Sequence, residues 1–214
     1  MKITFAESAK ADIIAFLVDE DGDLPEAAAA LNETTGGLLL EAMDGSRFSG
    51  KKDQQAFIVL PKGSDARRAV LIGAGKKDKR DARVLEGLGA NLYKSHSSSG
   101  FKSLAVHAGS AEDAARIALG AKLASYRFDT YFTKLKDDQK PSLESVTLVV
   151  SDVPAAEAAF VPLNAGAEGT KLARDLVNMP PNDLYPASFA EKCRELGQYG
   201  VQVEVLGEAE LAKL

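Results

Sequence analysis

With 214 residues, the chain is long for one domain and short for two complete ones. Apolar residues make up 45% of the sequence, enough for a buried core, and the formal charge of −5 argues against nucleic acid as the main partner. The single cysteine, Cys193, excludes an intramolecular disulfide framework, and the lack of a signal-peptide pattern or of an apolar run of roughly 18 residues predicts a soluble cytoplasmic protein with no membrane partner.

Short apolar runs alternate with helical patterns over the first 150 residues. In chain order, we expect strands at 2–5 and 12–18, a helix at 24–33, one or two helical turns at 36–43, strands at 56–60 and 67–75, a helix from about Asp78 to 95, a strand at 103–108, a helix at 110–126 and a strand at 145–150. Strands that alternate with helices favour a mixed or mainly parallel β-sheet flanked by helices on both faces, which is an α/β fold.

Two of these helices carry clear local signals. The helix near Asp78 has apolar residues at 3.6-residue spacing, and Ser110 and Asp113 have the spacing of a capping box at the start of the next one. Small residues on one face of that second helix favour close packing. The two apolar sets are Val84, Leu85, Leu88 and Leu92, and Ala114, Ile117, Ala118 and Ala121.

The pattern changes after Pro154. We expect one long helix up to Asn178, or a helix broken near Pro162, and Pro180 and Pro181 then end it firmly. An Asn182–Asp183 turn leads into a further helix and strand. That helix has Pro186 in its first turn, capping-box spacing at Ser188 and Glu191, and Gly197 as its end; a strand at 201–206 and a helix start at 207–214 follow, as at the opening of another α/β unit.

Gly73 and Gly75 lie between a predicted strand and a predicted helix, where backbone N–H groups can bind phosphate. The dinucleotide fingerprint requires a third glycine at the position of Asp78, and a P-loop requires a longer spacing with Lys-Ser/Thr. Both templates fail, so we interpret the glycines as a tight turn in preference to a phosphate site.

Two charged stretches invite functional interpretations. "DEDGD" offers Asp19, Asp21 and Asp23 to a calcium loop, but that loop requires Gly and Glu where this chain has Leu24 and Ala30. An acidic surface turn is the better interpretation. The basic residues Lys76, Lys77, Lys79, Arg80 and Arg83 are interrupted by Asp78 and Asp81, which favours a solvated loop over a nucleic-acid patch.

The remaining candidates also favour structural roles. His96 and His107 lack partners at metal-ligand spacing, and His107 lies in an apolar strand, as a core or strand-end histidine does. The sequence contains no G-x-S-x-G elbow, and Cys193 fits a small apolar position in a helix stripe with Phe189 and Leu196. We therefore predict no catalytic, metal-binding or cofactor-binding residue in this chain.

Three segments resemble a known family. "GTKLARDLVNMPPNDLYPASFAEKC", residues 169–193, closely resembles the entrance to the catalytic domain of the leucyl (cytosol) aminopeptidases. "IALGAKLASYRFDTYFTK" (117–134) and "VLIGAGKKDKRDARVLEGLGANL" (70–92) resemble earlier parts of the same family, in family order. The resemblance implies an N-terminal macro-domain-like α/β domain at 1–153, a linker helix at 154–181, and the first elements of a catalytic domain at 182–214.

The resemblance also implies the chemistry of the parent protein. Members of the family hold two divalent metals, zinc or manganese, by residues that lie beyond the "RDLVN-PPN" segment, and they remove N-terminal residues from peptides as homo-oligomers, by resemblance hexamers. "NAGAEGT" (164–170) is similar to the metal-site run Asn-Thr-Asp-Ala-Glu-Gly-Arg, but it has Gly166 for the ligand Asp and Thr170 for the Arg. Glu168 is therefore expected to be an exposed helix residue, and the fragment is expected to be inactive.

Three hypotheses remain for the chain itself. In the first, the chain is the N-terminal portion of an aminopeptidase. In the second, it is a binding module for an ADP-ribose-type ligand near "GAGKK" or for nucleic acid. In the third, it positions subunits in an oligomer. The second rests on fold analogy alone.

Overall fold

The computed structural model describes residues 1–213, apart from the side chain of Asp138. The backbone divides into two compact units, Met1–Gly169 and Thr170–Leu214. The first contains the sheet and both apolar cores, and the second contains short helices joined by irregular backbone.

A six-stranded sheet forms the centre of the first unit, with the strand order β1-β6-β5-β2-β4-β3. Five strands are parallel, and β3 pairs antiparallel with β4 at one edge. The predicted α/β class with a mixed sheet is confirmed. The strands are β1 (Lys2–Ala6), β2 (Ile13–Asp19), β3 (Gln55–Val59), β4 (Arg68–Gly75), β5 (Ser103–His107) and β6 (Ser145–Val149).

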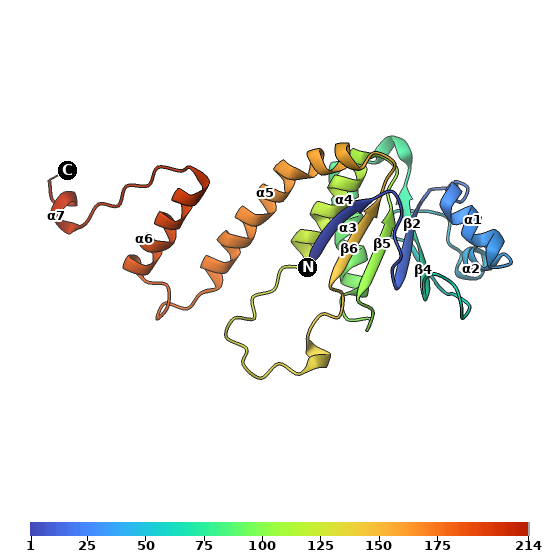
Figure 1. Ribbon diagram of the computed structural model, residues 1–214, viewed down its shortest axis with the longest axis horizontal. Coiled ribbons are helices and arrows are strands. Elements are labelled where there is room, and N and C mark those ends of the chain that lie inside the picture. The colour runs from blue at the N-terminus through green and yellow to red at the C-terminus, as the bar shows by residue number, and fades with distance from the viewer. Residues whose placement is uncertain (214) are drawn as a thin grey trace. The chain divides into compact units, whose positions relative to one another are not determined.

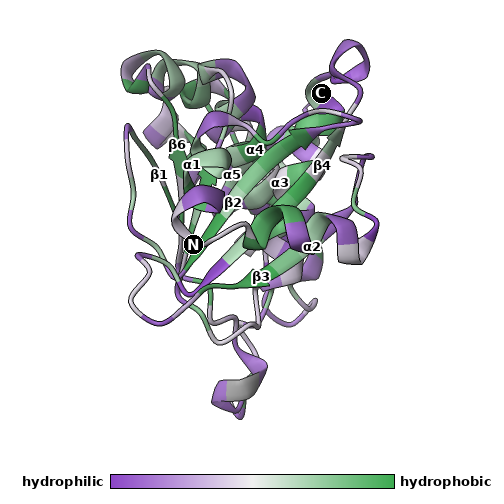
Figure 2. Cartoon of the chain, turned by 90° about the vertical axis from the view of Figure 1, so that its right-hand side faces the viewer, coloured by the Kyte–Doolittle hydropathy of each residue, from purple (hydrophilic) through white to green (hydrophobic). Residues whose placement is uncertain are grey.

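Helices cover both faces of the sheet (Figure 1). Helices α1 (Glu26–Thr34) and α2 (Leu38–Ser46) lie on one face, and α3 (Ala82–His96) and α4 (Ala111–Ala124) lie on the other. Side chains alternate along each strand, so Ile13 of β2 joins the α3–α4 core while Phe16 joins the α1–α2 core. Figure 2 shows the result: β2 and β4 are hydrophobic along most of their length, because both faces are buried.

The helix expected from about Asp78 begins later. A short 3-10 turn, η1 (Lys77–Lys79), comes first, and α3 starts at Ala82 because the Asp81 carboxylate accepts a hydrogen bond from Val84 N at 2.9 Å. The expected cap at the next helix is confirmed, since Ser110 Oγ accepts from Asp113 N at 3.1 Å.

Helices α3 and α4 pack closely against each other at two glycines. A Cβ at Gly89 would overlap the carbonyl oxygen of Ile117, and a Cβ at Gly120 would overlap that of Glu86. The small apolar face predicted for α4 is buried, as is the leucine stripe of α3. The backbones therefore approach at a distance that only glycine permits.

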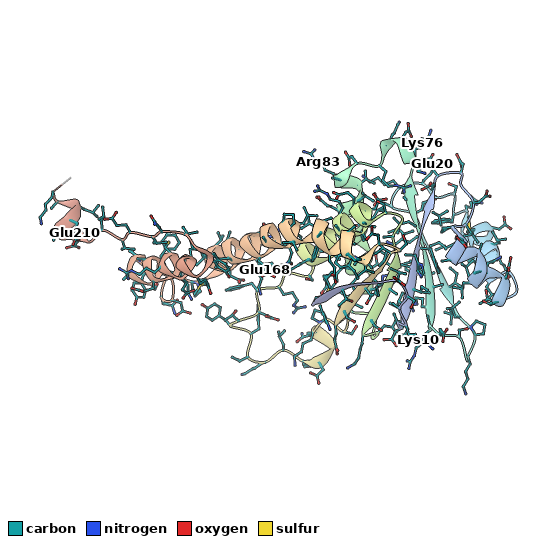
Figure 3. The ribbon with its side chains drawn as sticks, turned by 45° about the horizontal axis from the view of Figure 1, so that its top comes forward. Lys10, Glu20, Lys76, Arg83, Glu168 and Glu210 are labelled. Atoms are coloured by element: carbon teal, nitrogen blue, oxygen red, sulfur yellow. The ribbon has the colours of Figure 1, made fainter. Side chains whose placement is uncertain are left out.

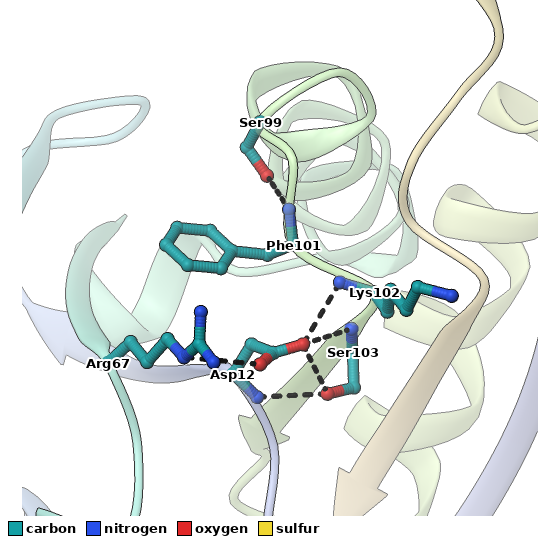
Figure 4. Close-up of polar contacts among 6 residues, drawn as sticks. All are labelled: Asp12, Arg67, Ser99, Phe101, Lys102 and Ser103. Carbon is teal, nitrogen blue, oxygen red and sulfur yellow. Dashed lines mark hydrogen bonds and ion pairs between the residues drawn. The ribbon is translucent and has the colours of Figure 1, made fainter. Parts of the chain in front are cut away.

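Asp12 fixes the start of β2 (Figure 4). Its Oδ2 accepts hydrogen bonds from Lys102 N at 3.0 Å, Ser103 N at 3.3 Å and Ser103 Oγ at 3.1 Å, and its Oδ1 lies 3.8 Å from Arg67 Nε. These contacts, the Lys102 N–H first among them, hold the pKa of the carboxyl below its usual range. One carboxylate thus ties β2 to the start of β5, 91 residues away in sequence.

The long helix predicted after residue 154 forms as α5 (Val153–Asn178). It continues through Pro162, so the alternative of a break there is wrong. The helix packs its first turns into the core through Ala156 and through Phe160, whose ring lies 5.5 Å from that of Phe5. Asn178 ends it, and a turn follows in which Asp183 N donates to Pro180 O.

The last part of the chain differs from the sequence prediction in three places. Helix α6 (Pro186–Arg194) begins with Pro186 as expected, but Tyr185 occupies the cap, and Ser188 Oγ accepts a hydrogen bond from Tyr185 N. The predicted Ser188–Glu191 box is therefore wrong. Gly197 does not end the helix: a 3-10 segment, η3 (Glu195–Tyr199), follows Arg194, and Gly200 takes the left-handed conformation at φ 82°.

Residues 201–206 are not a strand, although Val201, Val203 and Val205 alternate as strand residues do. A strand requires a neighbour for its N–H and C=O groups, and no described residue pairs with this segment. Helix α7 (Glu208–Leu211) then forms within the helix start expected at 207–214. Leu214, the last residue of that range, lies outside the described residues.

Candidate functional site

The strand order places a topological switch point between β2 and β5. From β2 the chain moves toward β3 and β4 through helices on one face, and from β5 it moves toward β6 through α4 on the other face. The connections therefore separate above the carboxyl ends of these two strands. Open α/β sheets bind their ligands in the crevice that such a separation creates.

A cavity of about 630 Å³ lies at this switch point. It is formed by the carboxyl ends of β2 and β5, by the loops that follow them, and by Lys77 and Arg80 from the loop after β4. We call it the switch-point crevice. Its lining residues are Leu17, Asp19, Asp23, Pro25, Glu26, Ala27, Lys77, Arg80, His107, Ala108, Gly109, Ser110 and Asp113.

Arg80 is a largely buried charged group that lines the crevice. Its guanidinium forms an ion pair with Asp19, the last residue of β2, and its side chain is only 12% exposed. The Nε atom of Arg80 is buried and has no hydrogen-bond acceptor among the described residues. A buried N–H donor without an acceptor is costly, and it indicates a group or a water molecule that completes the site.

Two helices begin at the crevice. Pro25 precedes α1 and Ser110 caps α4, and both residues line the cavity. The N-terminal ends of helices carry partial positive charge and point backbone N–H groups outward. The acidic side chains of Glu26 and Asp113, in the first turns of the two helices, balance part of that charge.

A second cavity, of about 690 Å³, adjoins the crevice. Both cavities are lined by Ala27 and His107. The floor of the second is apolar, with Ile14 and Phe16, and the His107 ring stacks on Phe16 at a centroid distance of 4.8 Å. Burial lowers the pKa of His107, so the ring is neutral at neutral pH. His107 therefore lies at a strand end, as expected, between two cavities.

The two glycines of "GAGKK" take part in the fold itself. Gly73 N donates to Gln54 O at 2.8 Å, and Gly75 N donates to Gly50 O at 2.9 Å. A Cβ at Gly73 would overlap the carbonyl of Lys51, and Gly75 has a φ of 71°. Their N–H groups are therefore not available to a phosphate, but both glycines lie within β4 (Arg68–Gly75), so the interpretation as a tight turn after the strand is wrong.

The basic residues after Gly75 lie at the same end of the sheet as the crevice. Glu20, Lys76 and Arg83 gather there, and Lys10 lies at the opposite end (Figure 3). Lys52, which sequence analysis did not connect with this group, lines a hollow of about 190 Å³ together with Lys76 and Lys79. All three lysines are exposed, as expected for a solvated loop.

The acidic stretch at 19–23 forms a turn at the end of β2. Asp19 pairs with Arg80, Glu20 N donates to Gly75 O, and Asp21 has a left-handed φ of 56°. Among residues 1–213 other than Asp138, no group of three or more His, Cys, Asp or Glu side chains is placed to hold a metal ion. No helix in that range is long and apolar enough to cross a membrane.

The other sequence candidates lie apart from the crevice. His96 is fully buried at the end of α3, where its Nδ1 bonds to Leu92 O at 2.9 Å and burial lowers its pKa. Cys193 is a half-buried free thiol on α6. Glu168 is an α5 residue whose carboxylate lies 2.6 Å from Lys122 Nζ and whose side chain is 52% exposed.

Comparison with protein families gives a match over more than half of the chain. Residues 15–135 match the N-terminal domain of the cytosol aminopeptidase family. The chain is 41% identical over 202 residues to a probable cytosol aminopeptidase of Caulobacter vibrioides. The alignment covers 94% of this chain and 41% of that protein. A probable cytosol aminopeptidase of Agrobacterium fabrum is 40% identical over 219 residues, covering 99% and 44%. The chain thus spans about two-fifths of these relatives.

Solved structures share the fold. A mutant of tomato leucine aminopeptidase superposes with a TM-score of 0.80 at 24% identity, over 100% of this chain and 46% of that one. The bottromycin maturation enzyme BotP in complex with Mn superposes with a TM-score of 0.68 at 24% identity, over 95% and 40%.

Proposed function

Because the chain belongs to the cytosol aminopeptidase family, we propose that it is the N-terminal portion of a metallo-aminopeptidase that releases N-terminal residues, leucine-like ones preferred, from peptides. The carrying observation is the coverage: nearly the whole chain aligns, but with only 41% of the Caulobacter vibrioides relative. In this proposal the metal ligands and catalytic groups belong to the remainder of the parent protein.

The proposed organisation follows the family. Residues 1–153 form the macro-domain-like accessory domain, 154–181 form the linker helix, and 182–214 form the first elements of the catalytic domain. The second compact unit begins at Thr170, within the proposed linker helix, and none of its described residues is buried. Several large apolar side chains stay exposed there, among them Val177, Tyr185 and Tyr199 at 85%, 53% and 74%.

Exposed apolar side chains of this kind indicate a surface that a partner covers. We assign that role to the remainder of the parent protein and to neighbouring subunits of a homo-oligomer, a hexamer by family resemblance. The first unit, with its complete core, then serves as a scaffold that positions subunits. Peptide substrates bind the catalytic part, in the cytosol.

The parent enzyme would use two divalent metals, manganese or zinc. The named complex of BotP with Mn supports manganese as one choice. When bound, such ions would activate water as the nucleophile and polarise the scissile carbonyl. Glu168 takes no part, since it pairs with Lys122 on the surface of the first unit.

Hydrolysis of leucine p-nitroanilide tests the proposal. The 214-residue chain, incubated with Mn²⁺ or Zn²⁺, is expected to give no turnover above buffer, while a protein extended to the full length of the relatives hydrolyses the substrate. Turnover by the 214 residues at the rate of the extended protein would refute the assignment of the chemistry to the remainder. Inactivity of the extended protein would refute the aminopeptidase assignment itself.

A further inference from the structure

Strand β3 forms an open edge of the sheet (Figure 2). It pairs antiparallel with β4 on one side, and no described strand pairs with it on the other side. An edge strand presents a row of unpaired N–H and C=O groups, and proteins usually protect such an edge with a lysine, a proline or a bulge. The sequence of β3, "QAFIV", contains neither lysine nor proline, and its register with β4 is unbroken. This edge is therefore open to another chain.

The opposite edge strand, β1, differs in both respects. It begins with Lys2, and none of its apolar side chains is exposed, because Ile3 and Phe5 pack against the α3–α4 core. In β3, by contrast, Phe57 is 53% exposed and Val59 is 77% exposed. Apolar surface that remains exposed beside an unprotected strand edge indicates a place where a partner binds.

The register of β3 shows which of its backbone groups face the open edge. Residues of an antiparallel strand alternate between those that bond to the neighbouring strand and those that face away from it. Leu60 N donates to Arg67 O, and Gln54 O accepts from the next strand as well, so the even-numbered positions bond to β4. The N–H and C=O groups of the odd-numbered positions therefore face the open edge, and their side chains share one face of the sheet. These positions are Gln55, Phe57 and Val59.

This edge is complementary to a second copy of itself. An antiparallel arrangement about a two-fold axis at Phe57 places Phe57 opposite Phe57 of the second copy, and Gln55 opposite Val59. Each opposed pair then consists of residues whose N–H and C=O groups face the edge, so each pair can exchange both hydrogen bonds. We propose that β3 pairs with β3 of a second copy of this chain, which joins two six-stranded sheets into one.

The composition of β3 favours an identical partner over a foreign one. The strand carries no charge that would select an acidic or a basic segment, and no like charges oppose each other in the self-paired register. The two phenylalanine rings meet at the axis, where aromatic pairs stabilise antiparallel strands. The strand has only 5 residues, so the contact is smaller than a standard interface of about 1,600 Å² and the dimer is expected to be weak.

Charged substitutions at the axis test the register. Phe57→Lys and Phe57→Glu each place two like charges directly opposite each other, so each variant should remain monomeric. A mixture of the two places a lysine opposite a glutamate and should restore the pairing.

A second substitution tests the edge without touching the core. Val59→Lys gives β3 the lysine that protected edges carry, and the two-fold axis repeats the change at both ends of the paired strands. Val161→Lys, at a 67% exposed position of α5, is the matched control. Both valines are largely exposed, so neither lysine should affect folding.

The test is sedimentation equilibrium of the 214-residue chain, with circular dichroism to verify folding. We expect a monomer–dimer equilibrium with a Kd on the order of 10–100 µM, as suits a small interface. Val59→Lys and each Phe57 variant should weaken dimerisation by about tenfold or more, and Val161→Lys should leave it unchanged. The equimolar mixture of Phe57→Lys and Phe57→Glu should associate about tenfold more tightly than either variant alone.

Several outcomes would overturn the proposal. One is a folded chain that stays monomeric at about 1 mM, well above the expected Kd. Another is a dimer that Val59→Lys leaves unchanged, which is decisive even if the Phe57 variants do not fold. Loss of the dimer in Val203→Pro but not in Val59→Lys would place the contact at the unpaired segment 201–206 instead. A mixture of folded Phe57 variants that associates no better than its components would refute the two-fold register.

The pairing concerns the first unit and does not depend on peptidase activity. Its failure therefore leaves the proposed function intact, and hydrolysis of leucine p-nitroanilide by the extended protein remains the separate test of that function.

Discussion

Replacement of Gly89 by alanine should destabilise the protein, although alanine is the better helix former. The propensity gain is about 0.5–1 kcal/mol in a helix interior. Against it, the new Cβ overlaps the carbonyl of Ile117 in α4, and because both partners are backbone atoms of packed helices, α3 and α4 must move apart. Overpacking of this kind costs about 1–3 kcal/mol. After the propensity gain is subtracted, the expected net loss is roughly 1 kcal/mol, with an upper limit of about 2.5 kcal/mol.

Urea unfolding followed by circular dichroism measures this loss as a lower midpoint at unchanged slope. Gly87, two residues earlier in the same helix, is the matched control, because a Cβ there meets nothing within 4 Å. Gly87→Ala should therefore stabilise the protein by about 0.5–1 kcal/mol. A Gly89→Ala variant as stable as the parent chain would refute the close backbone contact between α3 and α4.

Three further predictions concern other parts of the chain. Asp12→Asn should lower the free energy of unfolding at pH 7 by about 1–3 kcal/mol, since the carboxylate accepts three hydrogen bonds. Because the pKa of Asp12 is depressed in the folded state, this contribution is present above about pH 4 and is lost as the pH falls below that value. A difference between the urea midpoints of the two proteins that persists at pH 2 would contradict the assignment. Backbone amides of Val203 and Val205 should exchange with solvent much faster than those of β2 in hydrogen-exchange mass spectrometry, and slow exchange would show a strand partner. Glu168→Gln should lower the free energy of unfolding by at most about 1 kcal/mol, because its ion pair with Lys122 is half-exposed. The substitution should leave Mn²⁺ binding in calorimetry unchanged, and weaker Mn²⁺ binding would indicate that Glu168 is a metal ligand.

The sequence determined most of the secondary structure of the first unit. Alternating apolar runs predicted all six strands, and the Ser110–Asp113 cap and the proline exit at 180–181 set helix ends through contacts within a few residues. A predicted helix start or cap was wrong where another residue formed the cap, as Asp81 does before α3 and Tyr185 before α6. The prediction also failed at 201–206, because alternation gives a strand only if another strand is there to pair with it.

The candidate site was beyond the reach of sequence analysis. Asp19, Glu26, Arg80 and His107 come from four separate segments, and they meet only because β5 pairs with β2 and not with β4. The residue pattern led to a calcium interpretation of Asp19 and a nucleic-acid interpretation of Arg80, and it gave no signal at Glu26. Spacing along the chain records which residues are neighbours within one helix or strand, whereas strand order is decided by the packing of whole elements against one another. The sequence alone thus determined an α/β chain with family-specific segments, and the tertiary structure alone decided where its charged groups converge.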